Sequence, residues 1–446
     1  MPMITNQSPI AFSDPLPDEV DVVVIGAGVA GTATAFFLAE KGVKVLLCEK
    51  GRVAGEQSSR NWGWIRQQGR DWRELPIMME SNKIWRGLAE RTGEADLTFT
   101  QSGSLHLIED EEKLQKFEEW FDIAKEHQLD TRMLTKDEIA AKYPNIRGNF
   151  IAGLETESDG RGEPFVAIPA LARAAQRLGV SVIEGCAVRT LDIQGGRIAG
   201  VVTEKGRVKC AQAVLAGGAW STYFAANTGV NLPQLTVRST VARTTPLPEH
   251  YVRNTNTPGL ALRRRADGGY TIASMDLAEH YVSKASFKYF LKFINLLRVS
   301  AKDVRLKIGP PKGYPGAWGS PSRWTAEQES PFERMRVLNP DPSPISLQRI
   351  RDRLPSRYPD IKEAGFAETW AGMIDVTPDA VPTLGPVDEV EGLHIATGLS
   401  GHGFGIGPAI GRIMSDIVTG KPTGHEVGHF RNRRFFDGSE IVPGPY

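Results

Sequence analysis

An aliphatic run, a glycine-rich turn and a helix-forming stretch, VDVVVIGAGVAGTATAFFLAEKGVKVLLCEKG, constrain the fold more than any other part of the chain. Val20–Ile25 is nearly all aliphatic and β-branched, which is typical of a parallel strand buried on both faces. The composition of Val29–Lys41 predicts a helix that ends at Gly42, because glycine is common just after a helix C-terminus. A second aliphatic run, Val43–Cys48, completes a β-α-β unit. We therefore expect an α/β fold with a parallel sheet.

The glycine spacing between the first strand and the helix is that of a dinucleotide-binding turn. Gly26 permits the tight turn, Gly28 lets the backbone approach a pyrophosphate, and Gly31 lets the helix pack closely on the strand. The helix N-terminus offers free N–H groups and the positive end of its dipole to the phosphates. Glu49 lies about 20 residues downstream, where a carboxylate accepts hydrogen bonds from ribose hydroxyls and repels a 2′-phosphate. The expected contacts are Gly26, Ala27, Gly28, Val29, Ala30, Gly31, Glu49 and Lys50.

This motif alone does not separate FAD from NAD, but the far end of the chain favours FAD. GLHIATGLSGHGFGIGPAIGRIMSDIVTG contains a short strand, Leu393–Ala396, and then five closely spaced glycines. Pro408 suits the first turn of a helix, and Ala409–Val418 continues as an amphipathic helix. A nicotinamide enzyme completes its dinucleotide site within one contiguous domain. A flavoenzyme has a reason for the second loop, because a helix N-terminus stabilises the negative charge of reduced flavin. A glycine-rich turn that serves only packing is the structural alternative.

The middle of the chain is consistent with the same site. Cys186–Ser221 alternates short strand-like runs with glycine turns, which predicts a small β-meander that leads back into the nucleotide-binding sheet. We expect four cofactor contacts from this segment, with the first near the adenine: Val188, Ala216, Gly217 and Trp220.

Composition excludes several classes of function. At 446 residues the chain exceeds one ordinary core, so two domains are expected. Lysine plus arginine and aspartate plus glutamate number 53 each, so no net field favours nucleic acid or an anionic membrane. The three cysteines show no CxxC spacing, which argues against a disulfide framework or a metal site and for a reducing compartment, the cytoplasm.

The two ends of the chain are expected to be peripheral. Residues 1–19 lack the basic start and apolar block of a secretory signal and predict a mobile, proline-bearing arm. No run of apolar residues approaches the roughly 18 that a transmembrane helix needs.

One short stretch, SSRNWGWIRQQGRD, concentrates two tryptophans and three arginines in Ser58–Asp71. A solvated loop does not need tryptophan and a core has no use for three guanidinium groups, so this mixture predicts the lining of a pocket.

Together these segments resemble the D-amino-acid oxidase superfamily of flavoenzymes, which includes glycine oxidase, sarcosine oxidase and the D-amino-acid dehydrogenases. The resemblance runs from about Val20 to about Phe430, with all landmarks in the family order. The landmarks are GAGVAG, the acid Glu49, VLAGGAW, WAGMIDVTPDAVPTLGPV and SGHGFGIGPAIG.

The resemblance implies a Rossmann-like FAD-binding domain, with a parallel sheet flanked by helices and a β-meander. This domain is interleaved with an α+β substrate domain built on a mostly antiparallel sheet. The expected boundaries are residues 20–75, 160–225 and 370–430 for the FAD-binding domain, 76–159 and 226–369 for the substrate domain, and 431–446 for a C-terminal tail.

The resemblance also places the stretch around Asn61 beside the flavin ring. Asn61-Trp62-Gly63 matches an Asn-x-Gly of the D-amino-acid dehydrogenases, and Arg66 matches an arginine that binds the substrate carboxylate in sarcosine oxidases. The implied flavin contacts are Ser58, Ser59, Arg60, Asn61, Trp62, Gly63, Met373, Gly401, His402, Gly403, Phe404 and Gly405.

Two departures from the family pattern carry expectations of their own. Family members that attach flavin covalently use a histidine near position 60 or a cysteine near position 372, where this chain has Arg60 or Trp62 and Gly372. We therefore expect non-covalent FAD. Sarcosine oxidases also carry a lysine that helps hold the carboxylate, and its equivalent here is Gly405, which argues against simple N-methylglycine as substrate.

Amine oxidation by flavin needs orientation of the substrate rather than a dedicated protein base. Arg66 is the best candidate for holding the carboxylate, with a structural salt bridge as its alternative. Trp64 either walls the site or packs at the domain seam. Asp375 either meets a substrate ammonium or caps the Thr377 turn, and His402 acts as a base or positions backbone against the flavin.

Three further features lie outside the expected centre. Arg70 is expected to form a local ion pair with Asp71. Arg263–Arg265 is expected to be a solvated charge cluster, with the alternative that one of these arginines contributes to a pocket for a second carboxylate. Tyr270 is a possible wall of the pocket. Ser286–Gly309 has helical apolar spacing and predicts one amphipathic helix, which either covers the substrate domain or docks on a membrane surface or partner.

We expect an FAD-dependent oxidoreductase that oxidises the C–N bond of an amino acid or N-substituted amino acid by hydride transfer to flavin N5. The resulting imine hydrolyses, and the electrons pass to O2 or to a partner. One alternative is an opine-type secondary-amine dehydrogenase that feeds a quinone or protein acceptor. Another is a non-catalytic FAD-bearing subunit of a complex. The sequence does not indicate an oligomeric state.

Overall fold

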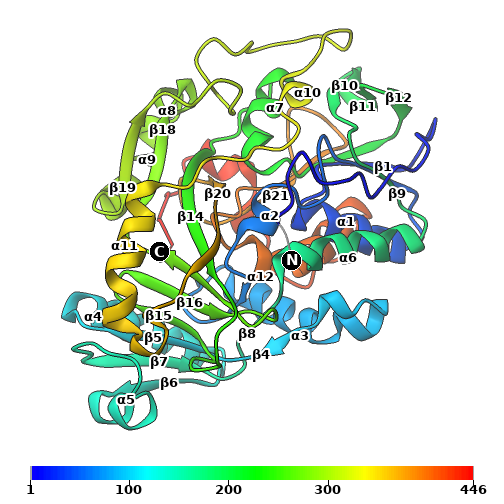
Figure 1. Ribbon diagram of the computed structural model, residues 1–446. Coiled ribbons are helices and arrows are strands. Elements are labelled where there is room, and N and C mark those ends of the chain that lie inside the picture. Colours follow the sequence, from blue (N-terminus) through cyan, green and yellow to red (C-terminus); the bar gives the residue numbers. More distant parts are fainter. Residues whose placement is uncertain (1–2, 445–446) are drawn as a thin grey trace.

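The structure, a computed structural model, describes residues 3–444 and contains two main sheets (Figure 1). Six strands form the first sheet: β1 (Val22–Ile25), β2 (Val45–Cys48), β9 (Ser181–Ile183), β13 (Gln212–Leu215), β21 (Thr383–Pro386) and β22 (Leu393–Thr397). Their spatial order is β21-β22-β13-β1-β2-β9, and every neighbouring pair is parallel except β21 with β22. All four residues of β1 are buried, as the aliphatic run predicts.

Three longer helices lie beside this sheet: α1 (Val29–Glu40), α6 (Pro164–Arg177) and α12 (Gly403–Val418). A fourth, α3 (Leu75–Thr92), lies against α12. α1 packs against both α6 and α12, and α12 also packs against α3. The predicted β-meander is confirmed: it consists of β10 (Val188–Gln194), β11 (Arg197–Thr203) and β12 (Gly206–Lys209), all antiparallel, and the chain then returns to the first sheet through β13.

The second sheet has ten strands: β5 (Ser104–Ile108), β6 (Thr131–Thr135), β7 (Ala152–Thr156), β14 (Leu235–Thr244), β15 (Asn254–Thr257), β16 (Leu260–Arg264), β17 (Tyr270–Ser274), β18 (Ala278–Val282), β19 (Val304–Ile308) and β20 (Phe366–Val376). Their order is β19-β18-β14-β17-β16-β15-β5-β7-β6, with β20 paired to β14. Most pairs are antiparallel, and β15 with β5 and β18 with β19 are parallel. The predicted fold class is confirmed.

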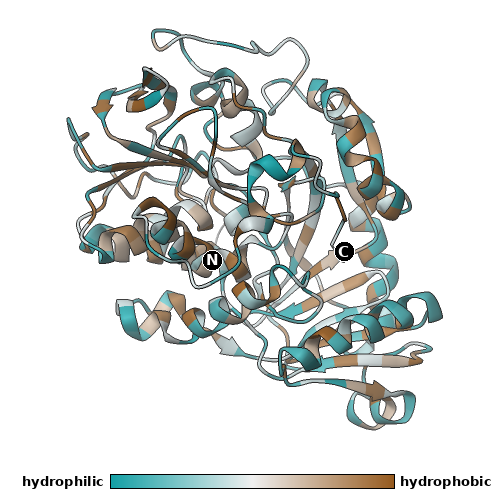
Figure 2. Cartoon of the chain, turned by 180° about the vertical axis from the view of Figure 1, so that it is seen from behind, coloured by the Kyte–Doolittle hydropathy of each residue, from teal (hydrophilic) through white to brown (hydrophobic). Residues whose placement is uncertain are grey.

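Shorter elements complete the fold. A small third sheet contains β3 (Trp64–Ile65), β4 (Thr100–Gln101) and β8 (Gly160–Arg161). The remaining helices are α2 (Gln57–Arg60), α4 (Glu111–Glu126), α5 (Lys136–Lys142), α7 (Ser221–Asn227), α8 (Lys284–Lys288), α9 (Phe290–Ser300), α10 (Pro331–Arg334) and α11 (Pro344–Arg357). Five 3-10 turns are Ala95–Leu97, Gly218–Trp220, Pro359–Ile361, Gly428–Phe430 and Asn432–Phe435. Figure 2 shows brown, hydrophobic segments mainly in the strands and on the inner faces of helices.

The antiparallel pair of β14 and β20 connects the second sheet to the first. Leu235 pairs with Val376 at one end and Thr244 with Phe366 at the other. β20 thus belongs to the second sheet, although the expected boundary at residue 370 divides it. The end of β20 leads into β21 and the first sheet, so the substrate sheet and the nucleotide sheet share one continuous segment.

The helix at the C-terminal glycine loop begins earlier than predicted. α12 starts at Gly403, so Pro408 lies inside the helix and not in its first turn. Glycine disfavours helix, so closely spaced glycines predict a loop here. The close packing of α12 on α1 requires residues without side chains at these positions. A Cβ at Gly407 would lie 2.3 Å from Cγ2 of Val29, and one at Gly411 would lie 2.4 Å from Cβ of Ala33.

The segment predicted as one amphipathic helix at 286–309 is a helix pair followed by a strand. α9 ends at Ser300, and Val304–Ile308 forms the edge strand β19, because its apolar residues alternate with a period of two. Within the helix pair, Phe293 and Leu296 are buried, whereas Phe287, Phe290 and Leu291 are exposed.

The predicted solvated arginine cluster is wrong. Arg263 is buried and forms an ion pair with Glu163 at 2.8 Å, and Arg265 is buried and pairs with Asp267 at 2.7 Å. Glu163 lies in a distant segment and Asp267 in the turn after the arginines. The three consecutive arginines therefore did not indicate these ion pairs. Tyr270 is also buried, and its hydroxyl accepts hydrogen bonds from the amides of two residues, His250 and Tyr251.

Both ends of the described chain are anchored. Phe12 is buried, Ala11 N donates to Glu184 at 2.7 Å, and Asp14 accepts from Val182 N at 2.8 Å, so this part of the expected mobile arm packs beside β9. In the tail, buried Arg434 pairs with Asp379 at 2.8 Å. Within residues 3–444 no helix is long and apolar enough to cross a membrane.

The contact between α1 and α12 yields a stability prediction. Gly411→Ala should destabilise the protein by about 1–3 kcal/mol, because the new methyl group overlaps the backbone and side chain of Ala33. The control is Gly87→Ala on α3, where a Cβ meets nothing within 4 Å and helix propensity should raise stability by about 0.5–1 kcal/mol. Urea unfolding of the two variants measures both changes, and equal stability for both would contradict the packing described.

Candidate functional site

A cavity lies at the carboxyl ends of the central strands of the first sheet. Its walls come from six separate segments: 25–30, 48–61, 186–188, 215–220, 373–375 and 396–404, with Phe224 and Phe332 added. The glycine loops from the two ends of the chain therefore line one cavity. Open parallel sheets commonly bind ligands at this edge.

The first glycine loop has the conformation that its sequence predicts. Gly26 has a φ of +101°, and a Cβ there would lie 2.6 Å from the carbonyl oxygen of Ala216. A Cβ at Gly31 would lie 1.9 Å from the carbonyl oxygen of Gly26, so only glycine lets α1 approach the turn. Gly28 lies on the cavity wall just before the first turn of α1, whose N–H groups lack partners within the helix. This arrangement fits a pyrophosphate.

Glu49 follows β2 and lies on the cavity wall. Its carboxylate accepts hydrogen bonds from Ala27 N at 2.9 Å and Gly51 N at 2.8 Å, which hold it beside the glycine turn. Burial raises the pKa of Glu49 to about 7, although Lys50 acts in the opposite direction. A ligand that donates hydrogen bonds to this carboxylate would favour its ionised form, as ribose hydroxyls do.

The second glycine loop presents the N-terminus of α12 to the same cavity. Gly401, Gly403 and Phe404 line the wall, and no side chain of residues 3–444 caps the first turn of this helix. Gly398 and Gly401 have φ values of +69° and +83°, which glycine adopts without strain. The positive end of the α12 dipole therefore lies at the cavity, where it favours negative charge on a bound group.

Asp375 holds the loop that leads into α12. Its Oδ2 atom accepts from Gly398 N at 2.7 Å, from Leu399 N at 3.3 Å and from the hydroxyl of Thr397 at 3.3 Å. Burial raises the pKa of Asp375, and these hydrogen bonds oppose that shift. Asp375 lines the cavity, but its carboxylate bonds point to the loop and not to the Thr377 turn.

His402 directs its ring away from the cavity wall that its neighbours form. Its Nδ1 atom lies 2.9 Å from Oε2 of the buried Glu74, at the start of α3. Burial lowers the pKa of His402, with a further contribution from Arg70, whereas Glu74 acts in the opposite direction. This placement supports the interpretation that His402 positions backbone rather than acts as a base.

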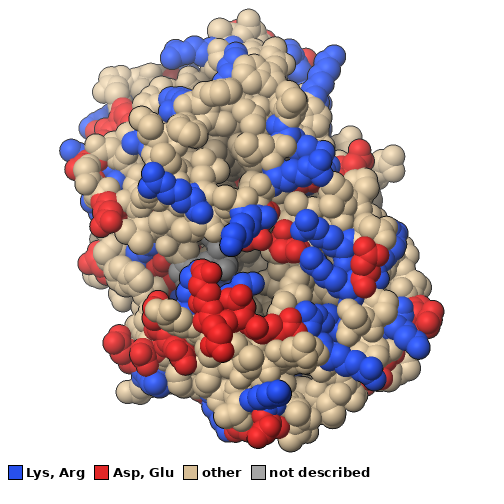
Figure 3. All heavy atoms as spheres, turned by 90° about the vertical axis from the view of Figure 1, so that its left-hand side faces the viewer, with Lys and Arg blue, Asp and Glu red and all other residues tan. Residues whose placement is uncertain are grey.

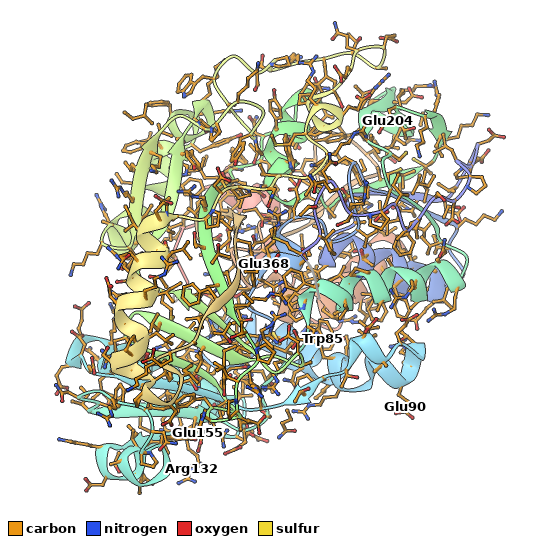
Figure 4. All side chains as sticks on the ribbon, viewed as in Figure 1. Trp85, Glu90, Arg132, Glu155, Glu204 and Glu368 are labelled. Carbon is orange, nitrogen blue, oxygen red and sulfur yellow. The ribbon has the colours of Figure 1, made fainter. Side chains whose placement is uncertain are left out.

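α3 holds the first turn of α12 at two further points. The carbonyl oxygen of Gly405 accepts from Ser81 Oγ at 2.6 Å and from Trp85 Nε1 at 3.0 Å. The ring of Trp85 also packs against Phe404, with ring centroids 5.0 Å apart. Figure 4 labels Trp85, which points from α3 into the protein, and Glu90 on the same helix, which points outward. The position of α12 thus depends on α3.

The stretch Ser58–Gly63 contributes two residues to the cavity wall, Ser58 and Asn61. Ser58 Oγ accepts from Val29 N at 2.9 Å, which connects this stretch to the start of α1. Arg60 is buried and donates to the carbonyl oxygens of Ala371 and Gly55, so it serves the backbone behind the wall. Burial lowers the pKa of Arg60 to about 10.

Arg70, which is buried, and Arg66, which is partly buried, lie beside the Glu74–His402 contact. Arg66 donates to the carbonyl oxygen of Gln68, and the Nη1 atom of Arg70 is buried with no hydrogen-bond partner among residues 3–444. Burial and the charge of Arg66 lower the pKa of Arg70 to about 9. The expected pair of Arg70 with Asp71 is wrong, because Asp71 bonds Arg73 at 2.7 Å.

Of the expected site residues, seventeen lie on the cavity wall: Gly26, Gly28, Val29, Ala30, Glu49, Lys50, Ser58, Asn61, Val188, Ala216, Gly217, Trp220, Met373, Asp375, Gly401, Gly403 and Phe404. Ten others lie behind or beside that wall: Ala27, Gly31, Ser59, Arg60, Trp62, Gly63, Trp64, Arg66, His402 and Gly405. Trp64 is buried against Trp62, with ring centroids 5.8 Å apart, and its Nε1 atom has no partner among the described residues.

Sequence reasoning missed several wall residues. Glu56 lines the cavity. Its carboxylate accepts a hydrogen bond from Leu338 N at 2.9 Å and forms an ion pair with the Lys50 ammonium at 2.5 Å. One feature of the sequence could have indicated Glu56, because it lies two residues before Ser58, an expected flavin contact. Phe332 reaches the wall from the short helix α10, and nothing in the local sequence indicates that contact.

Comparisons with known proteins agree with this geometry. A sequence model of the family described as FAD dependent oxidoreductase matches residues 21–417. The structure of L-amino acid deaminase from Proteus myxofaciens in complex with anthranilate is 33% identical, with a TM-score of 0.90, over 96% of this chain and 97% of that one. L-amino acid deaminase from Proteus vulgaris is 28% identical, with a TM-score of 0.88, over 97% of this chain and 100% of that one.

One of the curated relatives is a longer protein than this chain. The 4-methylaminobutanoate oxidase (formaldehyde-forming) of Paenarthrobacter nicotinovorans is 25% identical over 411 residues, which cover 92% of this chain and 45% of that protein. The chain spans less than half the length of the first curated relatives that it matches.

The raised pKa of Glu49 predicts a pH-dependent affinity for FAD. If ribose hydroxyls donate to the ionised carboxylate, binding expels the proton that apoprotein holds below about pH 7, so affinity rises between about pH 6 and pH 8. Glu49→Gln should abolish this rise and weaken binding at pH 8 roughly tenfold to a hundredfold, because a charge-assisted hydrogen bond is lost. Titration of apoprotein followed by FAD fluorescence measures both; an unchanged pH profile in the variant would contradict this role of Glu49.

Proposed function

The chain belongs to the family of FAD-dependent oxidoreductases, and we propose that it oxidises the C–N bond of an L-α-amino acid. The observation that carries this proposal is the likeness to L-amino acid deaminase, which extends over nearly the whole of both chains and so includes the FAD cavity and the substrate sheet. FAD is the cofactor of the family, and the walls of the cavity fit it.

Three groups of residues would hold FAD. The turn at Gly26–Gly31 and the first turn of α1 suit the pyrophosphate, and Glu49 suits a ribose. The first turn of α12 suits the part of the flavin ring that becomes negative on reduction. We propose that FAD is held non-covalently, because Arg60 is engaged with backbone carbonyls and position 372 is a glycine.

FAD, when bound, supplies the acceptor for the hydride that leaves the substrate Cα. The task of the protein is to bind the substrate carboxylate, orient Cα–H and exclude water. The product is an imine, which water converts to a 2-oxo acid and ammonia. Electrons then leave the enzyme to O2 or to an acceptor partner.

We propose that Arg66 and Arg70 supply the charge that binds the substrate carboxylate. The Arg70 side chain is buried and that of Arg66 is partly buried, which lowers the pKa of each, and the free Nη1 of Arg70 is a donor without a partner among the described residues. A buried unpaired donor is costly, and a carboxylate offers it a strong charge-assisted hydrogen bond. Glu74 and Asp159 balance part of this charge without bonding either guanidinium.

Oxidation of an N-methylated amino acid is the second candidate. The similarity to 4-methylaminobutanoate oxidase over 92% of this chain favours it. The two candidates differ in their products, because a primary amine yields ammonia, whereas an N-methyl substrate yields methylamine or formaldehyde.

Anaerobic bleaching of the flavin tests the proposed function directly. The absorbance of the holoenzyme should be lost with L-α-amino acids and retained with their D-enantiomers, with ammonia released on reoxidation. Bleaching by N-methyl amino acids alone would favour the second candidate. Retention of colour with every amine tested would contradict both and would favour a non-catalytic FAD-bearing subunit. Readmission of air then tests whether O2 restores the colour or whether a carrier is needed.

The arginine pair generates a kinetic prediction. Arg66→Lys should raise the KM and lower kcat/KM roughly tenfold to a hundredfold, because lysine keeps the charge but loses the planar pair of donors, while FAD content stays unchanged. Arg70→Lys should act in the same direction.

The control for both variants is Arg73→Lys in the same loop. Arg73 is already paired with Asp71, so its substitution should leave the kinetics unchanged. Equal kinetics for Arg66→Lys and Arg73→Lys would remove Arg66 from the site.

A further inference from the structure

Glu74 is a buried acid beside Arg66 and Arg70, and the proposed function leaves it without a contact to the substrate. It immediately precedes α3, whose N-terminus favours negative charge, and its side chain is 0% exposed. Its Oε2 atom lies 2.9 Å from Nδ1 of His402, whereas its Oε1 atom is buried with no hydrogen-bond partner among residues 3–444. A buried acceptor without a partner costs free energy, and in native proteins such an atom is a sign that a ligand or an ordered water completes the site.

The second acid near the two arginines has no oxygen to offer to a ligand. Oδ1 of Asp159 accepts from Gln67 N at 2.7 Å, and Oδ2 accepts from Gln68 N at 3.3 Å. Both carboxylate oxygens therefore hold the backbone of the loop that carries the arginines. Of the two acids, Glu74 is the one with an oxygen that lacks a partner in the described part of the chain.

A donor without a partner lies near this acceptor. The charge of Glu74 raises the pKa of Arg70 against the effect of burial, so the two side chains are electrostatic neighbours. Within residues 3–444 they form no ion pair, and Nη1 of Arg70 is buried without a hydrogen-bond partner. Buried charges in proteins are normally paired. A guanidinium and a carboxylate that are close but do not meet therefore suit a ligand that carries charges of both signs.

An α-amino acid has this distribution of charge. Its carboxylate and its ammonium group are attached to the same carbon atom, so one small ligand supplies both. A carboxylic acid bound at Arg70 would bring its carboxylate close to that of Glu74, and like charges repel strongly where the dielectric is low. The ammonium group of an amino acid replaces this repulsion with a charge-assisted hydrogen bond.

His402 connects Glu74 to the FAD cavity. Its ring contacts Oε2 of Glu74, and its neighbours Gly401 and Gly403 line the cavity wall at the start of α12. Glu74 is thus one hydrogen bond removed from the part of the chain that borders the proposed position of the flavin ring. A substrate nitrogen bound at Glu74 would lie on the side of the site where oxidation of its Cα takes place.

The surface of the protein does not make this selection. Figure 3 shows acidic and basic side chains together on one face, and the chain as a whole has 53 residues of each sign. Mixed charge of this kind gives no long-range field that favours ligands of one sign. Discrimination between a zwitterion and an anion therefore depends on buried groups, where the low dielectric strengthens each contact.

We propose that Oε1 of Glu74 binds the α-ammonium group of the substrate while Arg70 binds the carboxylate, so that the two select α-amino acids over carboxylic acids that lack the amino group. This inference deepens the proposed function and rests on it. His402 is a positioning residue in this arrangement, because it fixes the carboxylate of Glu74 without touching the substrate. Two fixed substituents on Cα also determine which of the other two faces the flavin, which contributes to the choice between L- and D-enantiomers.

A matched pair of ligands tests the proposal on the holoenzyme. One is the L-α-amino acid that bleaches the flavin fastest, and the other is the carboxylic acid with the same side chain and no amino group; L-phenylalanine and 3-phenylpropanoate form such a pair. Anaerobic stopped-flow absorbance gives the Kd of the amino acid, and an absorbance titration of the flavin gives the Kd of the carboxylic acid. The unchanged protein should bind the amino acid roughly tenfold to a hundredfold more tightly, because a charge-assisted hydrogen bond replaces a repulsion.

Glu74→Gln should remove this preference. The amide keeps the size of the side chain but loses its charge, so the Kd of the amino acid should rise roughly tenfold to a hundredfold. The Kd of the carboxylic acid should stay equal or fall, because a repelling charge is gone. A purely structural role of Glu74 would instead weaken both ligands alike. Arg70→Lys should weaken both, since both ligands carry the carboxylate.

Two other acids provide matched controls. Asp159→Asn removes a carboxylate beside the same arginines, but one whose oxygens hold the backbone. Glu80→Gln removes an acid of α3 that pairs with Arg412 at 2.5 Å. Neither substitution should change the ratio of the two Kd values. The flavin absorbance of each variant measures its FAD content.

Two results would overturn the role of Glu74. One is equal Kd values for the two ligands in the unchanged protein, a measurement that needs no variant to fold. The other is a ratio of Kd values that Glu74→Gln leaves unchanged while the amino acid still bleaches the flavin. Failure of every amino acid to bleach the unchanged holoenzyme is a separate result, because it contradicts the proposed function itself and, with it, this inference.

Discussion

Close packing of two helices from opposite ends of the chain is the contact on which the site depends. α1 and α12 approach through glycine and alanine, and a methyl group at Gly407 or Gly411 would overlap Val29 or Ala33. Because both helices begin at the same edge of the first sheet, this contact brings two helix N-termini to one cavity. One terminus suits a phosphate and the other suits the charge of reduced flavin. α3 then secures α12 through Gly405 and the His402–Glu74 bond.

Local sequence patterns predicted two kinds of element. One is the glycine turn, where a side chain must be absent, and the other is the buried strand, whose side chains are all apolar. The β-α-β unit, the β-meander and the shared use of both glycine loops could be predicted because a buried parallel strand and a phosphate turn leave few choices of residue. The start of α12 could not be predicted. Glycine locally favours a loop, and only the packing against α1 explains why these glycines are helical. Ser286–Gly309 was misread for a similar reason: helical spacing continues past Ser300, and only pairing with β18 shows that Val304–Ile308 is a strand.

Charged side chains were predicted least well, because their partners come from distant segments. Arg263 has the buried partner Glu163, and His402 has Glu74, neither of which is adjacent in sequence. The lack of a partner for Nη1 of Arg70 could not be predicted from the sequence either. The structure places this atom beside Arg66 in a low-dielectric region. If the arginine pair binds a carboxylate, as we propose, burial would strengthen that contact, and lysine would be a poor substitute because it lacks the planar donors of arginine.

The central claim is that both glycine loops hold one FAD molecule. A crystal structure of the FAD-loaded protein tests it most directly. The account predicts the pyrophosphate at Gly26–Gly31 and the first turn of α1, a ribose at Glu49, and the flavin ring at the first turn of α12. FAD bound away from either helix N-terminus, or contacting only one of the two loops, would contradict the account.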